Sequence, residues 1–336
     1  LRPAAIRESV AAACRIARHT SEDPAAGLAD PDLLASDVPD LDLYHPWTLD
    51  ADQAAYIARD CEDAARAADP RIGNSEGATL YTQGSSFVYG NSNGFVGGYP
   101  SSRHSLSCAV IAQQGDEMQR DDWYDSGRLP AELAEPAAIG RRAAKRTLAR
   151  LGGRRLGTRE CPVLFRADVA PSLLRSLFGA IRGHAVYRKS TFLLDRVGTQ
   201  VFPDWVRISE DPLRPRGQAS APFDNEGVAT RQRDLVSDGV LQGYLLDSYA
   251  ARKLGLHSTG HAGGVRNARI ADSGQSFEAL LREMGRGLVV TELMGQGTNP
   301  VTGDYSRGAA GFWVEDGEIR YPVEEITVAG NLKDMY

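Results

Sequence analysis

Cysteine is scarce in this sequence. The 336 residues include four cysteines, Cys14, Cys61, Cys108 and Cys161, and no two of them form a CxxC pair. Their spacing therefore predicts neither a disulfide framework nor a zinc ribbon. Dispersed cysteines are typical of a reducing compartment, so we expect a cytoplasmic protein. The chain begins at Leu1 without a methionine, which leaves room for a targeting signal in a missing N-terminal segment.

Long apolar runs and blocks of like charge are also missing. Even a largely apolar segment such as residues 287–293, which includes a threonine and a glutamate, has only the length of a strand, whereas a membrane-spanning helix needs roughly 20 apolar residues. Lys and Arg number 38 against 44 Asp and Glu, giving a net charge of −6 without a long block of either sign. We therefore predict no nucleic-acid partner and no membrane partner. The 42% hydrophobic content allows a sizeable core in more than one domain.

Several common catalytic signatures do not occur. None of the six histidines begins an HExxH motif, no GxSxG elbow is present, and residues 295–297 lack the third glycine of a dinucleotide loop. The nearest metal-like spacing is His257 and His261, which would share one face of a helix. Gly255 and Gly260 make a helix unfavourable there, so we expect a polar loop instead.

Two further clusters carry chemically useful side chains. Asp224 and Glu226 lie in an Asp-Asn-Glu-Gly run, which suits an acid and base pair but is also a good turn, and the turn is the favoured interpretation. Residues 302–308 place hydroxyls, an acid and a base between glycines, which suits a loop that recognises peptide backbone, with hairpin-loop packing as the alternative. The candidate peptide-binding residues are Asp304, Tyr305, Ser306 and Arg307.

Periodicity and turn residues predict an α+β fold of antiparallel or mixed sheets, built from hairpins with interspersed helices. We expect helices at 3–19, from Asp50 or Asp52 to about 68, at 134–151 and at 169–181. Expected strands are 85–89 with 95–99, 105–112 followed by a strand toward Trp123, 162–165, 235–236 with 240–241, and 312–314 with 319–321. The last two pairs turn at Asp238-Gly239 and Asp316-Gly317, which accept positive φ.

The composition changes along the chain and predicts more than one domain. Residues 1–46 combine an amphipathic helix with an acidic, Pro-rich linker that wraps between domains. Residues 47–152 read as a central α+β domain, and residues 157–336 as a C-terminal β-rich domain.

The amino-acid sequences of several segments resemble those of a known family. These segments are YRKSTFLLDRVG at 187–198, FDNEGVATRQRDLVSDG at 223–239, VTGDYSRGAAGFWVEDGEI at 301–319 and EITVAGNLKDM at 325–335. They are similar to the TldD/PmbA peptidase family, also called the modulator of DNA gyrase family, and most similar to its PmbA branch, TldE, which lacks the zinc motif. Family members continue beyond both ends, so the resemblance implies that residues 1–46 include the remnant of an N-terminal αβ domain.

The resemblance also implies where a zinc motif would lie. The TldD branch carries HExxxH on a helix, and the matching residues are Arg175-Ser176-Leu177-Phe178-Gly179-Ala180. Arg175 would replace the first ligand, Ser176 the general base and Ala180 the second ligand. A guanidinium stays protonated, a hydroxyl is a poor base and alanine has no donor atom. The resemblance thus implies no catalytic residue and no metal in this chain, and it puts the third ligand position beyond Tyr336.

The function implied is that of a non-catalytic subunit in a heterodimeric zinc peptidase that cleaves unfolded peptides, such as leader peptides and antitoxins. A TldD-like catalytic partner would hold the zinc, this chain would bind no cofactor, and a homodimer in isolation is a further expectation. One alternative is a freestanding hydrolase that uses an unrecognised metal, or an acid and base site, at Asp224, Glu226, His257 or His261. The other is a gyrase-modulating binding protein. Sequence fixes neither the peptide specificity nor the oligomeric state in isolation.

Overall fold

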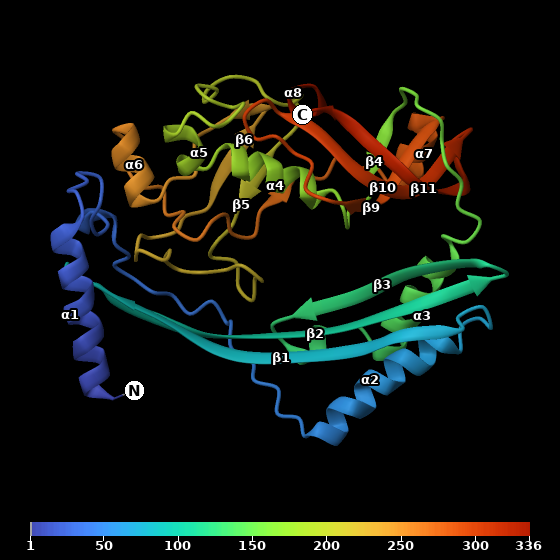
Figure 1. Ribbon diagram of the computed structural model, residues 1–336, viewed down its shortest axis with the longest axis horizontal. Helices are drawn as coiled ribbons and strands as arrows, with labels where there is room; N and C mark the ends of the chain where they lie inside the picture. The colour runs from blue at the N-terminus through green and yellow to red at the C-terminus, as the bar shows by residue number, and fades with distance from the viewer. Residues whose placement is uncertain (1) are drawn as a thin grey trace.

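The computed structural model describes residues 2–336, which form two stacked bodies (Figure 1). The first body has a three-stranded sheet covered by helices, and the second has two four-stranded sheets with short helices around them. Almost all strand pairs are antiparallel, and β4 with β9 is a parallel pair. The predicted α+β class, with mixed sheets in more than one domain, is confirmed.

The first body is a meander with two helices on one face. Its sheet has the order β1-β2-β3, and α2 and α3 pack against each other and against that sheet. Gly140 lies on α3 where a Cβ atom would overlap the carbonyl oxygen of Cys61 on α2, so the close helix crossing requires glycine. The elements are α2 (Ala51–Arg66), β1 (Asn74–Gly90), β2 (Val96–Gln114), β3 (Glu117–Gly127), a 3-10 turn (Pro130–Glu132) and α3 (Pro136–Leu148).

The second body contains most of the core. One sheet has the order β11-β10-β9-β4 and the other β7-β6-β5-β8, and apolar side chains of both meet those of α4. The strands are β4 (Val163–Phe165), β5 (Ile208–Glu210), β6 (Arg233–Ser237), β7 (Val240–Leu241), β8 (Arg269–Ile270), β9 (Gly287–Met294), β10 (Asp304–Glu315) and β11 (Glu318–Asn331). The helices are α4 (Pro171–Ala180), α5 (Gly183–Tyr187), α6 (Ser248–Leu254), α7 (Phe277–Met284) and α8 (Leu332–Met335).

Both predicted Asp-Gly turns are confirmed. Ser237 pairs with Val240 across the first turn, where Asp238 has φ 51° and Gly239 has φ 74°. The second turn joins β10 to β11, with φ 55° at Asp316 and 74° at the following glycine. Two central residues of positive φ define the tight turn whose twist matches that of paired strands.

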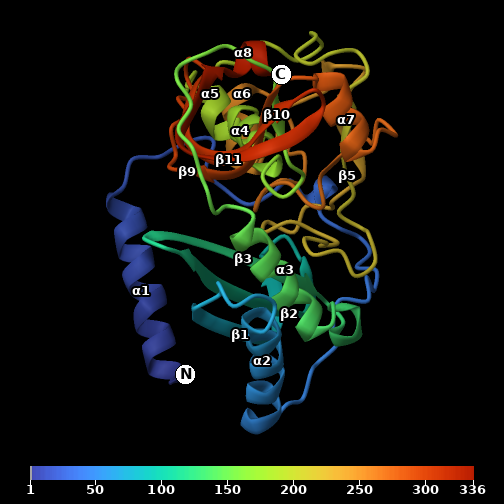
Figure 2. The same cartoon turned by 90° about the vertical axis from the view of Figure 1, so that its right-hand side faces the viewer.

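The N-terminal segment is helical and then irregular, as predicted. Helix α1 (Pro3–His19) has no buried residue, and Val10 on its apolar stripe is 58% exposed. In both views the helix stands away from α2 and α3 (Figure 2). Residues 20–46 then run along the second body, where a 3-10 turn (Pro31–Leu33) leads to a bridge between Leu34 and Val228.

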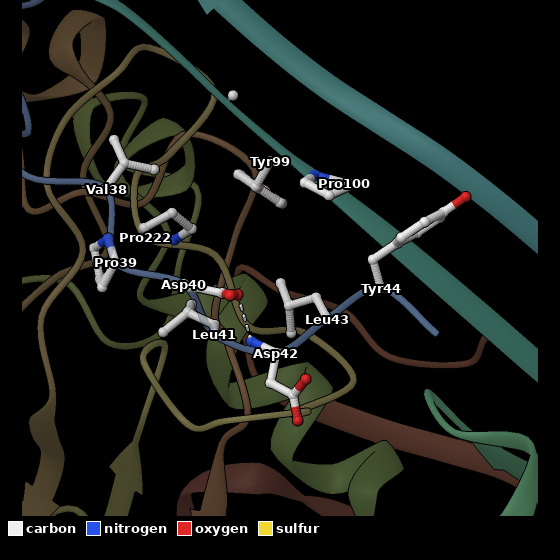
Figure 3. A pocket seen from close by; sticks show the side chains of 11 residues that line it. Val38, Pro39, Asp40, Leu41, Asp42, Leu43, Tyr44, Tyr99, Pro100 and Pro222 are labelled. Carbon is white, nitrogen blue, oxygen red and sulfur yellow. Dashed lines mark hydrogen bonds between the residues drawn. The ribbon is translucent and has the colours of Figure 1, made fainter. Parts of the chain in front are cut away.

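The tip of the β1–β2 hairpin is anchored to the second body by aromatic rings. Phe95 and Phe223 meet edge to face with centroids 5.1 Å apart, and Tyr99 contacts Phe223 in the same way at 5.6 Å. Next to this contact, residues 38–44 and Pro222 line a cavity of about 390 Å³ (Figure 3). Asp40 accepts a hydrogen bond from the backbone N–H of Asp42 at 2.9 Å there, so it shapes a turn. This cavity therefore belongs to the junction between the two bodies.

Candidate functional site

Helix α4 carries the positions that the resemblance matched to a zinc motif. A proline at its first turn starts the helix, and the residues are regular α-helix through Ala180. Arg175 is exposed whereas Ala180 is buried, because residues five apart on a regular helix point roughly 140° away from each other. Leu177 is fully buried in the core. The helix geometry and the residue types thus both fail to provide a pair of ligands.

An open cleft of about 540 Å³ borders α4. Its walls include Arg175, Ser176 and Ala180, and also Arg307 from the predicted peptide-binding loop, which lies on β10. The structure therefore brings together two groups of residues that are more than a hundred positions apart in the sequence. Sequence reasoning did not predict this proximity.

The cleft is strongly basic. Its charged walls are Arg175, Arg182, Arg188 and Arg307, with His184 beside them, and no Asp or Glu side chain lines it. Within residues 2–336 none of these four guanidinium groups forms an ion pair. Sequence analysis missed Arg182 and Arg188. Arg182 and Arg188 follow Arg175 after seven and thirteen residues, and this recurrence of arginine is the signal that could have drawn attention to them.

The prediction that the four candidate peptide-binding residues form a loop is wrong, because they pair with β11 as the first residues of strand β10. Their surroundings differ. The Asp304 carboxylate accepts hydrogen bonds from Thr302 Oγ1 at 2.5 Å and Asn331 Nδ2 at 3.0 Å, and these bonds lower the pKa of Asp304. Tyr305 is 2% exposed, and burial raises the pKa of its hydroxyl. Ser306 is exposed and Arg307 is half-buried in the cleft wall. A peptide-binding role for this segment stays a prediction.

The carboxylates of the alternative site hold the backbone in place. Asp224 is fully buried and accepts hydrogen bonds from the backbone N–H groups of Glu226, Val228 and Ala262, at 2.8 to 3.0 Å. Burial raises the pKa of the Asp224 carboxyl. Glu226 in turn accepts from the backbone N–H of Ser248 at 2.9 Å, at the first turn of α6. Both side chains thus support the turn interpretation.

His257 and His261 lie in a loop, as predicted. His261 is buried, with Nε2 2.7 Å from Glu210 Oε1 and Nδ1 2.8 Å from Thr259 Oγ1. Sequence analysis missed Glu210, which is remote in sequence and also lies 3.3 Å from Arg233 Nε. The part of the chain that the structure describes contains no group of three or more His, Cys, Asp and Glu side chains arranged to hold a metal ion.

One general property follows from the helices. Among residues 2–336, no helix combines the length and apolar character needed to cross a membrane.

Comparison with known proteins identifies the class. The family model for the PmbA/TldA metallopeptidase central domain matches residues 44–151, and that for the PmbA/TldA metallopeptidase C-terminal domain matches residues 158–336. The fold is therefore that of the PmbA/TldD metallopeptidase family. The chain belongs to the PmbA/TldD family, which confirms the predicted resemblance.

Individual relatives agree with this assignment. The chain is 56% identical to the metalloprotease PmbA of Escherichia coli O157:H7, over 100% of this chain and 75% of that protein. A crystal structure from Bacteroides thetaiotaomicron, named as a modulator of DNA gyrase, has a TM-score of 0.89 and 29% identity over 94% of this chain and 72% of that one. The TldE structure from Thermococcus kodakarensis has a TM-score of 0.84, covers 99% and 78% of the two chains, and is 21% identical, so it shows the shared fold.

Proposed function

We propose that this chain is the non-catalytic subunit of a two-subunit zinc peptidase, in which a TldD-like partner holds the zinc and cleaves unfolded peptides. One observation carries the proposal. Arg175, Ser176 and Ala180 border an open cleft at the position of the zinc motif, and none of them can act as a ligand or as a general base. Zinc does not fit these residues, so no catalytic step is assigned to this chain.

The packing of α4 supports the same proposal. Leu177 and Ala180 are buried in the core of the second body, and the Thr191 hydroxyl donates a hydrogen bond to the Ala180 carbonyl at 2.7 Å. An imidazole at position 180 would have to enter this core, where a polar ring without a partner is costly. Helix α4 therefore has a structural role in the core, and the open cleft beside it could accommodate part of a peptide substrate. The cytoplasmic location and a homodimer in isolation remain predictions.

The alternative hydrolase has less support. Asp224 and Glu226 are engaged by backbone N–H groups, and His261 is paired with Glu210 inside the fold. Asp224 and His261 are buried, so neither side chain is open to a substrate in this structure. A role in modulating gyrase is suggested by the names of related structures alone.

Reconstitution tests the proposed function. The purified chain, its TldD-like partner and their mixture are each incubated with an unfolded peptide, and the products are quantified by mass spectrometry. We expect no cleavage by this chain alone and cleavage by the mixture. Changing the glutamate of the partner's HExxxH motif to Gln should abolish activity in the mixture, because that residue would activate the zinc-bound water. Cleavage by this chain alone that a zinc chelator stops would refute the proposal.

A further inference from the structure

The basic cleft beside α4 has a charge that the fold leaves uncompensated. Arg175 comes from α4, Arg182 from the α4–α5 junction, Arg188 from the end of α5 and Arg307 from β10. At the junction between the two bodies, in contrast, arginine side chains form ion pairs. Arg150, for example, lies 2.5 Å from Glu292 and 3.8 Å from Asp121. Four guanidinium groups that form no ion pair with the described residues thus surround one acid-free cleft in a chain whose net charge is −6.

Two polar atoms in the cleft wall have no partner within the described chain. Ser172 is 7% exposed, and its Oγ is buried without a hydrogen bond. Arg307 Nε is likewise buried and unpaired. Buried donors in native proteins normally find an acceptor, and these two unmet donors belong to residues that line the same cleft.

The chemistry of the walls indicates which acceptor. Guanidinium groups donate paired, planar hydrogen bonds that match carboxylate and phosphate oxygens. The arginines come from four segments of the second body, and Ala180, Phe192 and Pro300 provide apolar contacts alongside them. An extended ligand that carries both carboxylates and apolar side chains uses all of these features, whereas a free inorganic anion uses only the charge.

We propose that this cleft binds the carboxylates of an acidic, extended peptide. That the ligand is a peptide rests on the proposed function, whereas the preference for carboxylate rests on the cleft itself. The cleft would then select acidic peptide segments on the non-catalytic subunit, at the position where the zinc motif would otherwise lie.

Binding to the isolated full chain tests the proposal without any need for cleavage. Fluorescence anisotropy is measured at low salt with an unstructured peptide containing several Glu residues, with its Gln counterpart, and with versions whose C-terminus is amidated. We expect the Glu peptide to bind about tenfold or more tightly than the Gln peptide, and added salt to weaken binding. A loss on amidation alone would assign the recognised carboxylate to the peptide's C-terminus and would equally support the proposal.

A matched pair of charge variants locates the site. The triple variant Arg175→Gln, Arg182→Gln, Arg188→Gln removes three cleft cations, and Arg7→Gln, Arg15→Gln, Arg59→Gln removes three exposed cations on α1 and α2. Thermal unfolding first verifies that both variants fold. We expect the cleft variant to lose about tenfold in affinity for the Glu peptide and the control to bind like the parent.

Three results would overturn the proposal. They are peptide binding that neither the Glu-to-Gln replacement nor amidation weakens, equal weakening by the cleft and control variants, and inorganic phosphate binding at the cleft in the absence of Glu-peptide binding. Because no partner and no turnover are involved, failure here leaves the reconstitution result untouched. Failure of reconstitution likewise leaves this binding measurement interpretable.

Discussion

The Asp224 carboxylate accepts hydrogen bonds from backbone N–H groups that are not part of a helix or a strand. It accepts three backbone N–H hydrogen bonds, two of them at Oδ1, and so fixes the turn that receives the β1–β2 hairpin. Gly227, with φ 81°, follows in that turn and lies against the rings of Phe95 and Tyr89. The buried acid therefore joins the hairpin to the second body, which explains its burial without a catalytic role.

Replacing Asp224 by Asn should destabilise the fold. An amide offers one acceptor oxygen, so its NH₂ group would face either the N–H of Ala262 or those of Glu226 and Val228. Leaving buried donors unpaired costs about 1–3 kcal/mol, and we expect the free energy of unfolding in urea to fall by that amount. Asp238→Asn, at an exposed turn position where Asn tolerates positive φ, should change it by less than about 0.5 kcal/mol. Equal effects of the two substitutions would contradict this role for Asp224.

Site residues differed in how far sequence could identify them. Arg175, Ser176 and Ala180 were found because the resemblance supplied a motif whose failure could be read from residue types. Arg307 was found as part of a loop, but its position opposite Arg175 depends on how β10 packs near α4. Glu210 could not be paired with His261 from sequence, because no local pattern links residues on β5 to a distant loop.

At the scale of elements, the irregular segment 20–46 is attached to α6 by an acid. Asp23 lies 2.9 Å from Lys253 Nζ and accepts a hydrogen bond from the Tyr249 hydroxyl at 2.6 Å. These bonds lower the pKa of Asp23 from its ordinary value of 3.8 to about 2, the bond from Lys253 being the larger cause. The attachment of the segment therefore depends on pH.

The lowered pKa of Asp23 sets the direction in which stability changes with pH. Because folding favours the ionised form, the contribution of Asp23 to stability is fully present above pH 3.8 and is lost as the pH falls through about 2. The difference in unfolding free energy between the parent and Asp23→Asn should thus be constant near neutral pH and shrink below about pH 4. Glu22→Gln, at an exposed neighbour, is the control. A parent-to-variant difference that stays constant down to pH 2 would show that the ion pair does not form.

Element boundaries were predicted where a local signal exists. Of the two predicted starts of α2, Asp50 and Asp52, the structure uses Asp50, which caps the helix through a capping box with Gln53. The strand predictions at 85–89 and 95–99 were too short, since β1 and β2 extend over Asn74–Gly90 and Val96–Gln114. The added part of β1 begins with Asn, Ser, Glu, Gly and Ala at residues 74–78, most of which have weak strand preference alone and become strand through pairing with β2.

The ends of helices are also predicted only where a local sequence signal marks them. The predicted helix 134–151 is shorter in the structure, where α3 spans Pro136–Leu148. Pro136 occupies the first turn and fixes the start, because its missing N–H needs no partner there. Residues 149–151 leave the regular helix before the Gly152-Gly153 break.

In the whole molecule, the two bodies are joined by polar as well as aromatic contacts. Arg146 on α3 lies 3.2 Å from Asp121 on β3 and 2.8 Å from Asp168 in the second body. Arg128 donates hydrogen bonds to the carbonyls of Gly217 and Gln218 from a largely buried position, and burial lowers its pKa. These contacts connect the first body to the second body, which contains the cleft beside α4. Such long-range pairs carry no local sequence pattern, so the sequence did not predict the junction between the two bodies.

This chain belongs to a metallopeptidase family, and we propose that it does not bind the catalytic metal itself. The most direct measurement is the zinc content, by mass spectrometry of the dialysed proteins, of the full chain, the TldD-like partner and their complex. Because Arg175, Ser176 and Ala180 offer no ligand, the account predicts no stoichiometric zinc in this chain and the same zinc per partner in the complex as in the partner alone. One zinc per chain in the isolated protein, removed together with peptide cleavage by a chelator, would contradict it.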